Sequence, residues 1–308
     1  MIKNNTFSII EHQVFSKEDL EEIFKEKAEG FYKELEDFAK NNENLLGFKN
    51  KNSLKAKNYV GIIQTKSGVL EILPKCTNLD SSSNHDKEKL RRCYELDNIS
   101  KNNDFYEKDF KFNPKNLLIN MLKTLKNSPF KKSQISSLQS SKIPLFEVFI
   151  TMFLDEFDSV YKKGLMRSYL SCEENRAFLK GKLLFNEHIK RNLIHKERFF
   201  TSNDEFVLDI APNRLIKSTL NFLKSKTSLN KFRLIKAMQM LDEVEFSKNY
   251  EKDFSYKISR HFDYYENLLL WCKIFLKNEG FMPYHGKNEA FALLFPMEKI
   301  FEDYVAYM

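Results

Sequence analysis

Glycine-rich loops and clustered histidines, which are common signatures of nucleotide and metal sites, are missing from this 308-residue chain. Its eight glycines form neither a GxxxxGK[ST] nor a GxGxxG motif, so we expect no nucleotide to be bound by this chain alone. Its six histidines are scattered and include no HExxH sequence, so we expect structural or surface roles for them. These absences exclude the commonest nucleotide-binding and zinc-binding motifs.

Cysteines and long apolar runs are also scarce. The four cysteines lie far apart and form no CxxC pair, which argues against a zinc knuckle and against a disulfide framework. No apolar run approaches the roughly 20 residues that a bilayer requires, and the N-terminus lacks the basic-then-apolar order of a secretory signal. We therefore expect a protein of the reducing cytoplasm that has no membrane partner.

The composition favours packed modules. Hydrophobic residues make up 42% of the chain and aromatic residues 14%, which supports globular packing rather than disorder. The 50 basic and 43 acidic residues leave a net charge of +7. This modest excess fits a nucleic-acid partner, but many proteins without one share it.

The N-terminal part, residues 1–112, is predicted to form a mixed α/β module. A strand-like segment leads to Ser16, which can cap a helix over residues 17–40 with Asp19 at the capping-box position. Residues 45–75 have the pattern of a β-meander with a glycine-containing hairpin turn. Polar residues 77–109 have the composition of a solvated insertion.

The rest of the chain is predicted to form a middle module, residues 113–211, and a helical lead-in, residues 212–308. The middle module has a helix from Pro114, a polar spacer over residues 128–141, a long helix from Pro144 with Gly164 after its end, and a small β section. Further helices are predicted over residues 213–226, 230–246, 262–277 and from 295 to the end. The predicted fold class is α+β with a mainly helical C-terminal half.

The last helix has an apolar face that no stop signal closes. Its apolar residues recur at helical spacing: Met297, Ile300, Phe301, Tyr304, Val305 and Met308. An ordinary terminal helix packed on its own core is one interpretation. The other is that a domain begins here and is cut off, so that Ile300, Phe301, Tyr304 and Val305 lack a sheet to pack on.

A series of short blocks carries a resemblance to a known family. The blocks are GIIQ at 61–64, LEILPK at 70–75, PLFEV at 144–148, EENRAFLKGKL from 173, HKERF at 195–199, DEF at 204–206 and NRLIK at 213–217. In their order and spacing they resemble McrC, the nuclease subunit of McrBC-type, modification-dependent restriction systems. The resemblance extends from about Tyr59 to Met308.

This resemblance implies a division of labour. A separate AAA+ GTPase of the McrB type forms a ring, binds GTP and recognises DNA with methylated cytosine. The McrC-like subunit docks in the ring, stimulates GTP hydrolysis and carries the nuclease, and it could form a homodimer within the larger complex. The missing nucleotide-binding loop agrees with this scheme.

The family nuclease is of the PD-(D/E)xK kind, in which carboxylates from a helix and a following hairpin hold Mg²⁺. By the resemblance, Glu302, or alternatively Glu298, is the helical carboxylate, although both also fit a solvated helix face. The sequence ends before a strand that could supply the other groups, so we expect an incomplete nuclease that holds no Mg²⁺ alone. The acid-x-Lys sequence Asp109-Phe-Lys111, with Asp97 upstream, is a rival active site.

Two basic segments are candidates for partner or DNA contacts. The turn with Arg176, Lys180 and Lys182 could reach an acidic surface, a phosphate or the GTPase site of a partner. Arg198, next to two phenylalanines, could stack on a base or guide a strand. The alternatives are solvated loop charge for the turn and core packing for the phenylalanines.

The sequence thus predicts a component that docks on and stimulates a partner GTPase ring, with the nuclease core missing. Two alternatives stay open. One is an active Mg²⁺-dependent endonuclease that uses another site, and the other is a non-enzymatic DNA-binding or adaptor protein.

Overall fold

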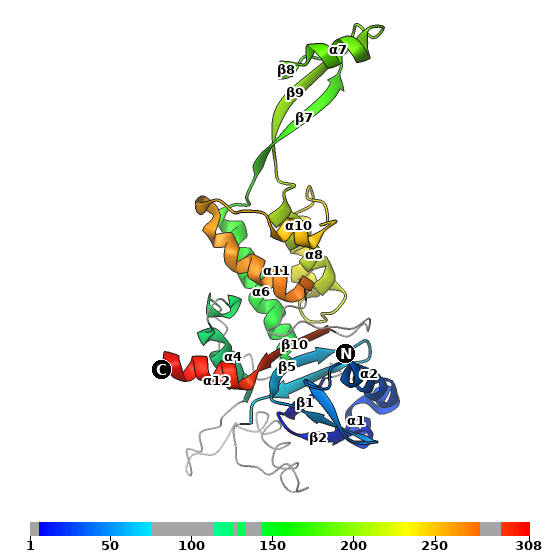
Figure 1. Cartoon of the computed structure of the whole chain (residues 1–308), viewed down its shortest axis with the longest axis vertical. Helices are drawn as coiled ribbons and strands as arrows, with labels where there is room; N and C mark the ends of the chain where they lie inside the picture. The colour runs from blue at the N-terminus through cyan, green and yellow to red at the C-terminus, as the bar shows by residue number, and fades with distance from the viewer. Residues whose placement is uncertain (1–5, 76–113, 126–127, 133–142, 278–290) are drawn as a thin grey trace.

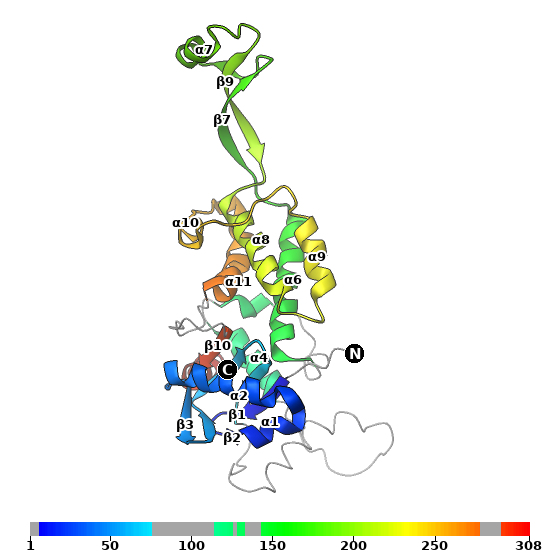
Figure 2. The same cartoon turned by 90° about the vertical axis from the view of Figure 1, so that its right-hand side faces the viewer.

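The computed structural model describes residues 6–75, 114–125, 128–132, 143–277 and 291–308. The molecule is elongated and has three parts along its length (Figures 1 and 2). The base comprises the N-terminal elements together with α4, β10 and α12. The helical body comprises α6 and the helices α8 to α11, and the arm comprises residues 168–207, which project beyond the body.

A four-stranded sheet forms the centre of the base. Its order is β1 (Thr6–Ile10), β6 (Val69–Leu73), β5 (Tyr59–Gln64) and β10 (Phe291–Pro296). The β1–β6 pair is parallel and the other pairs are antiparallel. The predicted hairpin is confirmed by the β5–β6 pair. Gly61 lies opposite Leu294 and has φ 138°, and a Cβ there would stand 2.1 Å from the Leu293 carbonyl oxygen, so glycine lets β10 approach β5.

A smaller sheet and two helices complete the N-terminal part of the base. The sheet has the order β2 (Val14–Ser16), β4 (Ser53–Ala56) and β3 (Leu46–Asn50). Ser16 begins α1 (Lys17–Phe24), and its backbone N–H donates to the Asp19 carboxylate at 2.8 Å, as the capping-box prediction requires. The single helix predicted over residues 17–40 is wrong, because Lys25 has φ 50° and a 3₁₀ turn (Lys25–Lys27) separates α1 from α2 (Ala28–Asn41).

The body is built around α6 (Leu145–Lys163), which the sequence predicted from its apolar spacing, Pro144 and Gly164. Around it lie α8 (Ala211–Lys224), α9 (Lys231–Gln239), α10 (Tyr250–Phe254), a 3₁₀ segment (Arg260–Tyr265) and α11 (Glu266–Lys277). The helix predicted over residues 230–246 ends earlier, at Gln239. Phe130, which the sequence assigned to a polar spacer, is buried, and its ring contacts those of Trp271 and Phe149.

Two buried carboxylates fix the start of α6. Glu71 of β6 accepts hydrogen bonds from the Leu145 backbone N–H at 2.6 Å and from Lys115 Nζ at 2.9 Å. Glu147 accepts from Thr227 Oγ1 at 2.6 Å and from the Ser228 backbone N–H at 2.8 Å. Because a buried carboxylate is costly unless it is hydrogen-bonded or paired, these contacts hold α6 against both the base and the α8–α9 loop.

The C-terminal segment differs from its prediction. Phe295 and Pro296 end β10 instead of starting a helix, and α12 (Met297–Tyr307) follows and packs against α4 (Pro114–Thr124). Ile300 is buried and Tyr304 packs against the core, so the expectation that they lack a packing partner is wrong. Phe301 and Val305 are exposed.

The predicted α+β fold class is confirmed. Within the described ranges, no helix combines the length and the apolar character that a membrane span requires. The predicted polar insertion over residues 77–109 lies outside the described residues.

Candidate partner-binding arm

The arm is a long β-hairpin that carries a small folded tip (Figure 1). Strand β7 (Ser168–Arg176) pairs along all nine residues with β9 (Phe199–Val207) in antiparallel register. The small β section predicted in the middle module thus includes one continuous strand, β9. Nine residues span about 30 Å. No residue of β7 is buried, and since an isolated hairpin is marginally stable in water, this exposed shaft is suited to a partner.

The paired strands β7 and β9 form the shaft of the arm, and two short elements at its end form the tip. Strand β8 (Lys182–Leu183) pairs with β9, and α7 (Phe185–Asn192) crosses the hairpin end. Gly181 precedes β8 with φ 78°, and a Cβ there would stand 2.4 Å from the Ser202 carbonyl oxygen. The turn into β8 therefore requires glycine.

Glu205 binds two of the predicted contact residues. Its Oε1 atom lies 3.0 Å from Lys180 Nζ and 3.0 Å from Arg176 Nη2, and it accepts from Asn203 Nδ2 at 3.2 Å. The hydrogen bonds from Lys180, Arg176 and Asn203 lower the pKa of the Glu205 carboxyl to about 2. Through their contacts with Glu205, Arg176 and Lys180 hold the turn against β9. Lys182 makes no ion pair with the described part of the chain.

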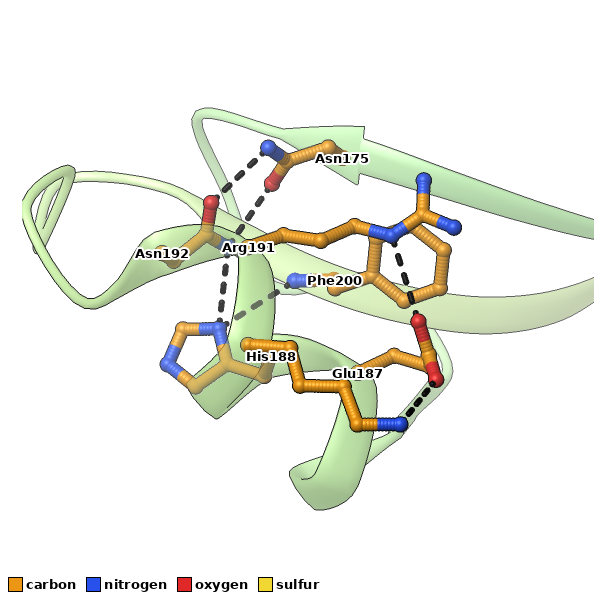
Figure 3. Close-up of polar contacts among 7 residues, drawn as sticks. Asn175, Glu187, His188, Arg191, Asn192 and Phe200 are labelled. Carbon is orange, nitrogen blue, oxygen red and sulfur yellow. Dashed lines mark hydrogen bonds and ion pairs between the residues drawn. The ribbon is translucent and has the colours of Figure 1, made fainter.

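A polar network holds α7 against the hairpin (Figure 3). The side-chain amides of Asn175 on β7 and Asn192 on α7 donate to each other, each at 2.8 Å. Asn192 Nδ2 also lies 3.0 Å from His188 Nδ1 and 3.2 Å from the Arg198 carbonyl oxygen. The Phe200 backbone N–H donates to the same His188 nitrogen at 3.4 Å. One buried asparagine thereby joins β7, α7 and the segment before β9.

The phenylalanines beside Arg198 belong to the packing of the tip. Phe200 is buried beneath Arg191, whose guanidinium carbon lies 4.5 Å from the ring centroid. Phe199 stacks on His188 with ring centroids 6.0 Å apart. Glu187 accepts from Arg191 and Lys190, both at 3.2 Å, and these hydrogen bonds, that of Lys190 foremost, lower the pKa of its carboxyl. Arg191 thus covers the ring of Phe200.

The outer surface of the tip is apolar and basic. The exposed large apolar side chains of the tip are Phe178, Leu179, Phe185, Ile189, Leu193 and Ile194. Residues 176–198 contain seven basic and two acidic side chains. Arg198 is exposed and, like Lys182, makes no ion pair with any described residue. An apolar surface of this kind on a projecting element is typical of a protein-binding site.

The predicted nuclease residues lie at the opposite end of the molecule. Glu298 accepts a hydrogen bond from Asn58 Nδ2 at 2.7 Å, and Glu302 is exposed on α12. No group of three or more His, Cys, Asp or Glu side chains that could hold a metal occurs among the described residues. The rival set of Asp97, Asp109 and Lys111 lies outside them.

Sequence reasoning found the basic turn but missed the network behind it. The sequence did not indicate that Asn175 and Asn192 bond to each other, because isolated asparagines are common in loops and caps. One signal was available: Phe185, Ile189 and Leu193 recur every four residues, which is the spacing of a helix face. That stripe marks α7 as an amphipathic element.

Comparison with known proteins identifies the family. The family model described as "McrBC 5-methylcytosine restriction system component" matches residues 54–308. The fold is similar to that of a chain in the cryo-EM structure of the Thermococcus gammatolerans McrBC complex, with 21% identity, TM-score 0.62 and coverage of 98% of this chain and 86% of that chain.

A second similar chain belongs to a refined half-complex from a tetradecameric assembly of T. gammatolerans McrB AAA+ hexamers with bound McrC. The identity is 21%, the TM-score is 0.63, and the match covers 98% of this chain and 69% of that chain. No curated protein matches the chain. The family predicted from the sequence blocks is confirmed, and the fold is consistent with a McrC-type subunit. The chain belongs to the family of McrBC 5-methylcytosine restriction system components.

Proposed function

We propose that this chain is the McrC-type component of a GTP-driven, methylcytosine-dependent restriction complex, and that it docks on and stimulates an AAA+ GTPase of the McrB type. The observation that carries the proposal is the projecting arm, because a narrow hairpin can enter a recess that a flat surface cannot reach (Figure 1). In the related assembly, McrC is bound to McrB AAA+ hexamers. Family membership supports the same arrangement here.

Within this proposal, the cations of the arm have two roles. Arg176 and Lys180 bind Glu205 and hold the shape of the turn. Lys182 and Arg198 are exposed and can pair with carboxylates or phosphate oxygens of the partner. A cation placed beside a transferring phosphoryl group stabilises the charge that develops there, which is how docking would stimulate GTP hydrolysis.

For the nuclease, Glu302 and Glu298 stay the proposed helical carboxylates. A Mg²⁺ site of this kind needs two or three converging carboxylates. Among the described residues, no third carboxylate lies with the two glutamates in a group that could hold a metal ion. We therefore derive no cleavage step from α12 and propose that the chain does not cut DNA alone.

Mixing the chain with its cognate GTPase tests the docking proposal. We expect the two proteins to co-migrate and GTP turnover to rise. The matched control replaces residues 172–203 with an Asn-Gly turn between Ser171 and Asp204, which are paired neighbours on β7 and β9, so that a short hairpin can close. This variant should neither co-migrate nor stimulate. The proposal is wrong if the full chain changes neither quantity.

An active endonuclease that uses Asp97, Asp109 and Lys111 is the alternative enzymatic function. It requires Mg²⁺-dependent cleavage of methylated DNA by the chain without the GTPase. Loss of that cleavage on Lys111→Ala would favour it over the docking role. Tight, salt-dependent DNA binding without any GTPase partner would instead favour a DNA-binding adaptor.

A further inference from the structure

The outer face of α7 presents an apolar stripe at the far end of the arm. Phe185, Ile189 and Leu193 recur every four residues, and 68%, 59% and 73% of their surfaces are exposed. We infer that this stripe is the anchor of the arm and that it fills an apolar pocket, rimmed by acidic side chains, on the AAA+ partner. The inference rests on the proposed function and specifies the contact surface of the arm.

The stripe is held in place before any partner binds. The side of α7 next to the stripe carries His188 and Asn192. Asn192 bonds to Asn175 of β7 and to the Arg198 carbonyl oxygen, and His188 accepts from the Phe200 backbone N–H of β9 (Figure 3). Asn192 is buried, and both polar ends of its side chain have hydrogen-bond partners. A fixed apolar surface loses little conformational freedom on binding, which favours tight association. Asn192 therefore acts as a positioning residue for the stripe.

The chemistry of the tip favours a protein over nucleic acid. The exposed apolar set is mostly aliphatic, and leucine and isoleucine cannot stack on bases as aromatic rings do. Aliphatic and aromatic side chains that lie together on one face fit an apolar pocket instead.

The charge pattern along the arm points the same way. The salt bridges of Arg176 and Lys180 with Glu174 and Glu205 leave Lys182, Lys196 and Arg198 at the tip, and Glu173 and Asp204 on the shaft, as charged side chains that form no ion pair with any described residue. A polyphosphate strand that lay along the arm would meet this acidic shaft. A protein pocket with an acidic rim pairs with the basic tip and leaves the shaft outside, so charge complementarity assigns the tip to a protein partner.

The test removes the stripe without touching the interior of the tip. The triple variant Phe185→Ser, Ile189→Ser and Leu193→Ser changes exposed side chains, so the melting temperature should stay that of the wild type. Binding to the cognate AAA+ GTPase, loaded with a non-hydrolysable GTP analogue, is measured by calorimetry. We expect the Kd to rise at least about tenfold, the size of effect found for anchoring side chains.

The matched control is Phe232→Ser, because Phe232 is also on a helix and is 79% exposed, but lies on α9 of the body. Its Kd should stay within about twofold of the wild type. If the wild type binds and the triple variant binds equally well, the stripe is not the anchor, while the docking function stands. If the wild type does not bind, both proposals are overturned.

A further variant tests the positioning role. Asn192→Ala should weaken binding in the wild-type background and add no further loss in the triple variant, because it acts through the stripe. Additive losses would overturn the positioning role. Binding of the wild type to duplex DNA or to phosphatidylglycerol vesicles that the triple variant loses would assign the stripe to another kind of partner and overturn the inference.

Discussion

The helix α6 and the strand β7 are joined by a few residues but differ in burial. The apolar side chains of α6 are mostly buried, and those of β7 are not. Along α6, eleven residues are buried, and the rings of Phe149, Phe153 and Phe157 lie in the core. Along β7 no residue is buried, and Tyr169 pairs with Phe206 in the open. The comparison teaches that burial of apolar side chains stabilises the body and the base, whereas the arm leaves its apolar side chains exposed.

The largest expected effect comes from the core side of this comparison. Phe149→Ala removes a buried ring that contacts Phe130 and Trp271, and should lower the free energy of unfolding by about 3–5 kcal/mol. Tyr169→Ala, in the exposed shaft, should lower it by less than about 1 kcal/mol. Urea unfolding of the full chain measures both. Equal losses would show that the arm shares the stability of the core.

A smaller effect is expected at the junction between base and body. Glu71→Gln removes the buried negative charge that lies 2.9 Å from Lys115 Nζ, so the free energy of unfolding should fall by about 3 kcal/mol. The matched control, Glu298→Gln, changes an exposed carboxylate that bonds Asn58, and should cost less than about 1 kcal/mol. A stability change at Glu71 no larger than the one at Glu298 would contradict the role assigned to the buried pair.

The smallest effect concerns the turn at the tip and depends on pH. Because the pKa of Glu205 is lowered from 4.5 to about 2 in the folded arm, its contribution to stability is present above pH 4.5 and is lost as the pH falls through about 2. Carboxyl-carbon NMR titration should give a midpoint near 2. In Glu205→Gln, the protection of the amide protons of the turn against exchange, relative to their intrinsic rates, should no longer fall as the pH is lowered from 4.5 to about 2. A midpoint near 4.5 would mean that Lys180 and Arg176 do not bind Glu205 in solution.

Elements with a strong local pattern could be predicted from the sequence. The spacing of apolar residues in α6, together with Pro144 and Gly164 at its ends, defined that helix. The glycine turn defined the β5–β6 hairpin, and Ser16 with Asp19 defined the start of α1. The family blocks then indicated a McrC-type protein.

Elements that depend on distant partners could not be predicted. Strand β10 is a short, continuous apolar run, which periodicity cannot distinguish from a buried helix, and its partner β5 lies far away in the sequence. The arm was missed as a unit because β7 is exposed on both faces and so lacks the alternation that marks a half-buried strand. The basic turn was found, but the pairing of Arg176 and Lys180 with Glu205 depends on a register that only the folded hairpin defines.

The contact between Glu71 of β6 and the start of α6 affects how far the arm can be displaced relative to the base. Helix α6 is a rod about 28 Å long, and the arm extends beyond its far end by about another 30 Å, away from the base (Figures 1 and 2). A tilt of about ten degrees at the Glu71 end would therefore displace the tip by about 10 Å. In such a rigid-body tilt the base is the pivot, so a small change around Glu71 and Lys115 would produce a larger displacement at the tip of the arm.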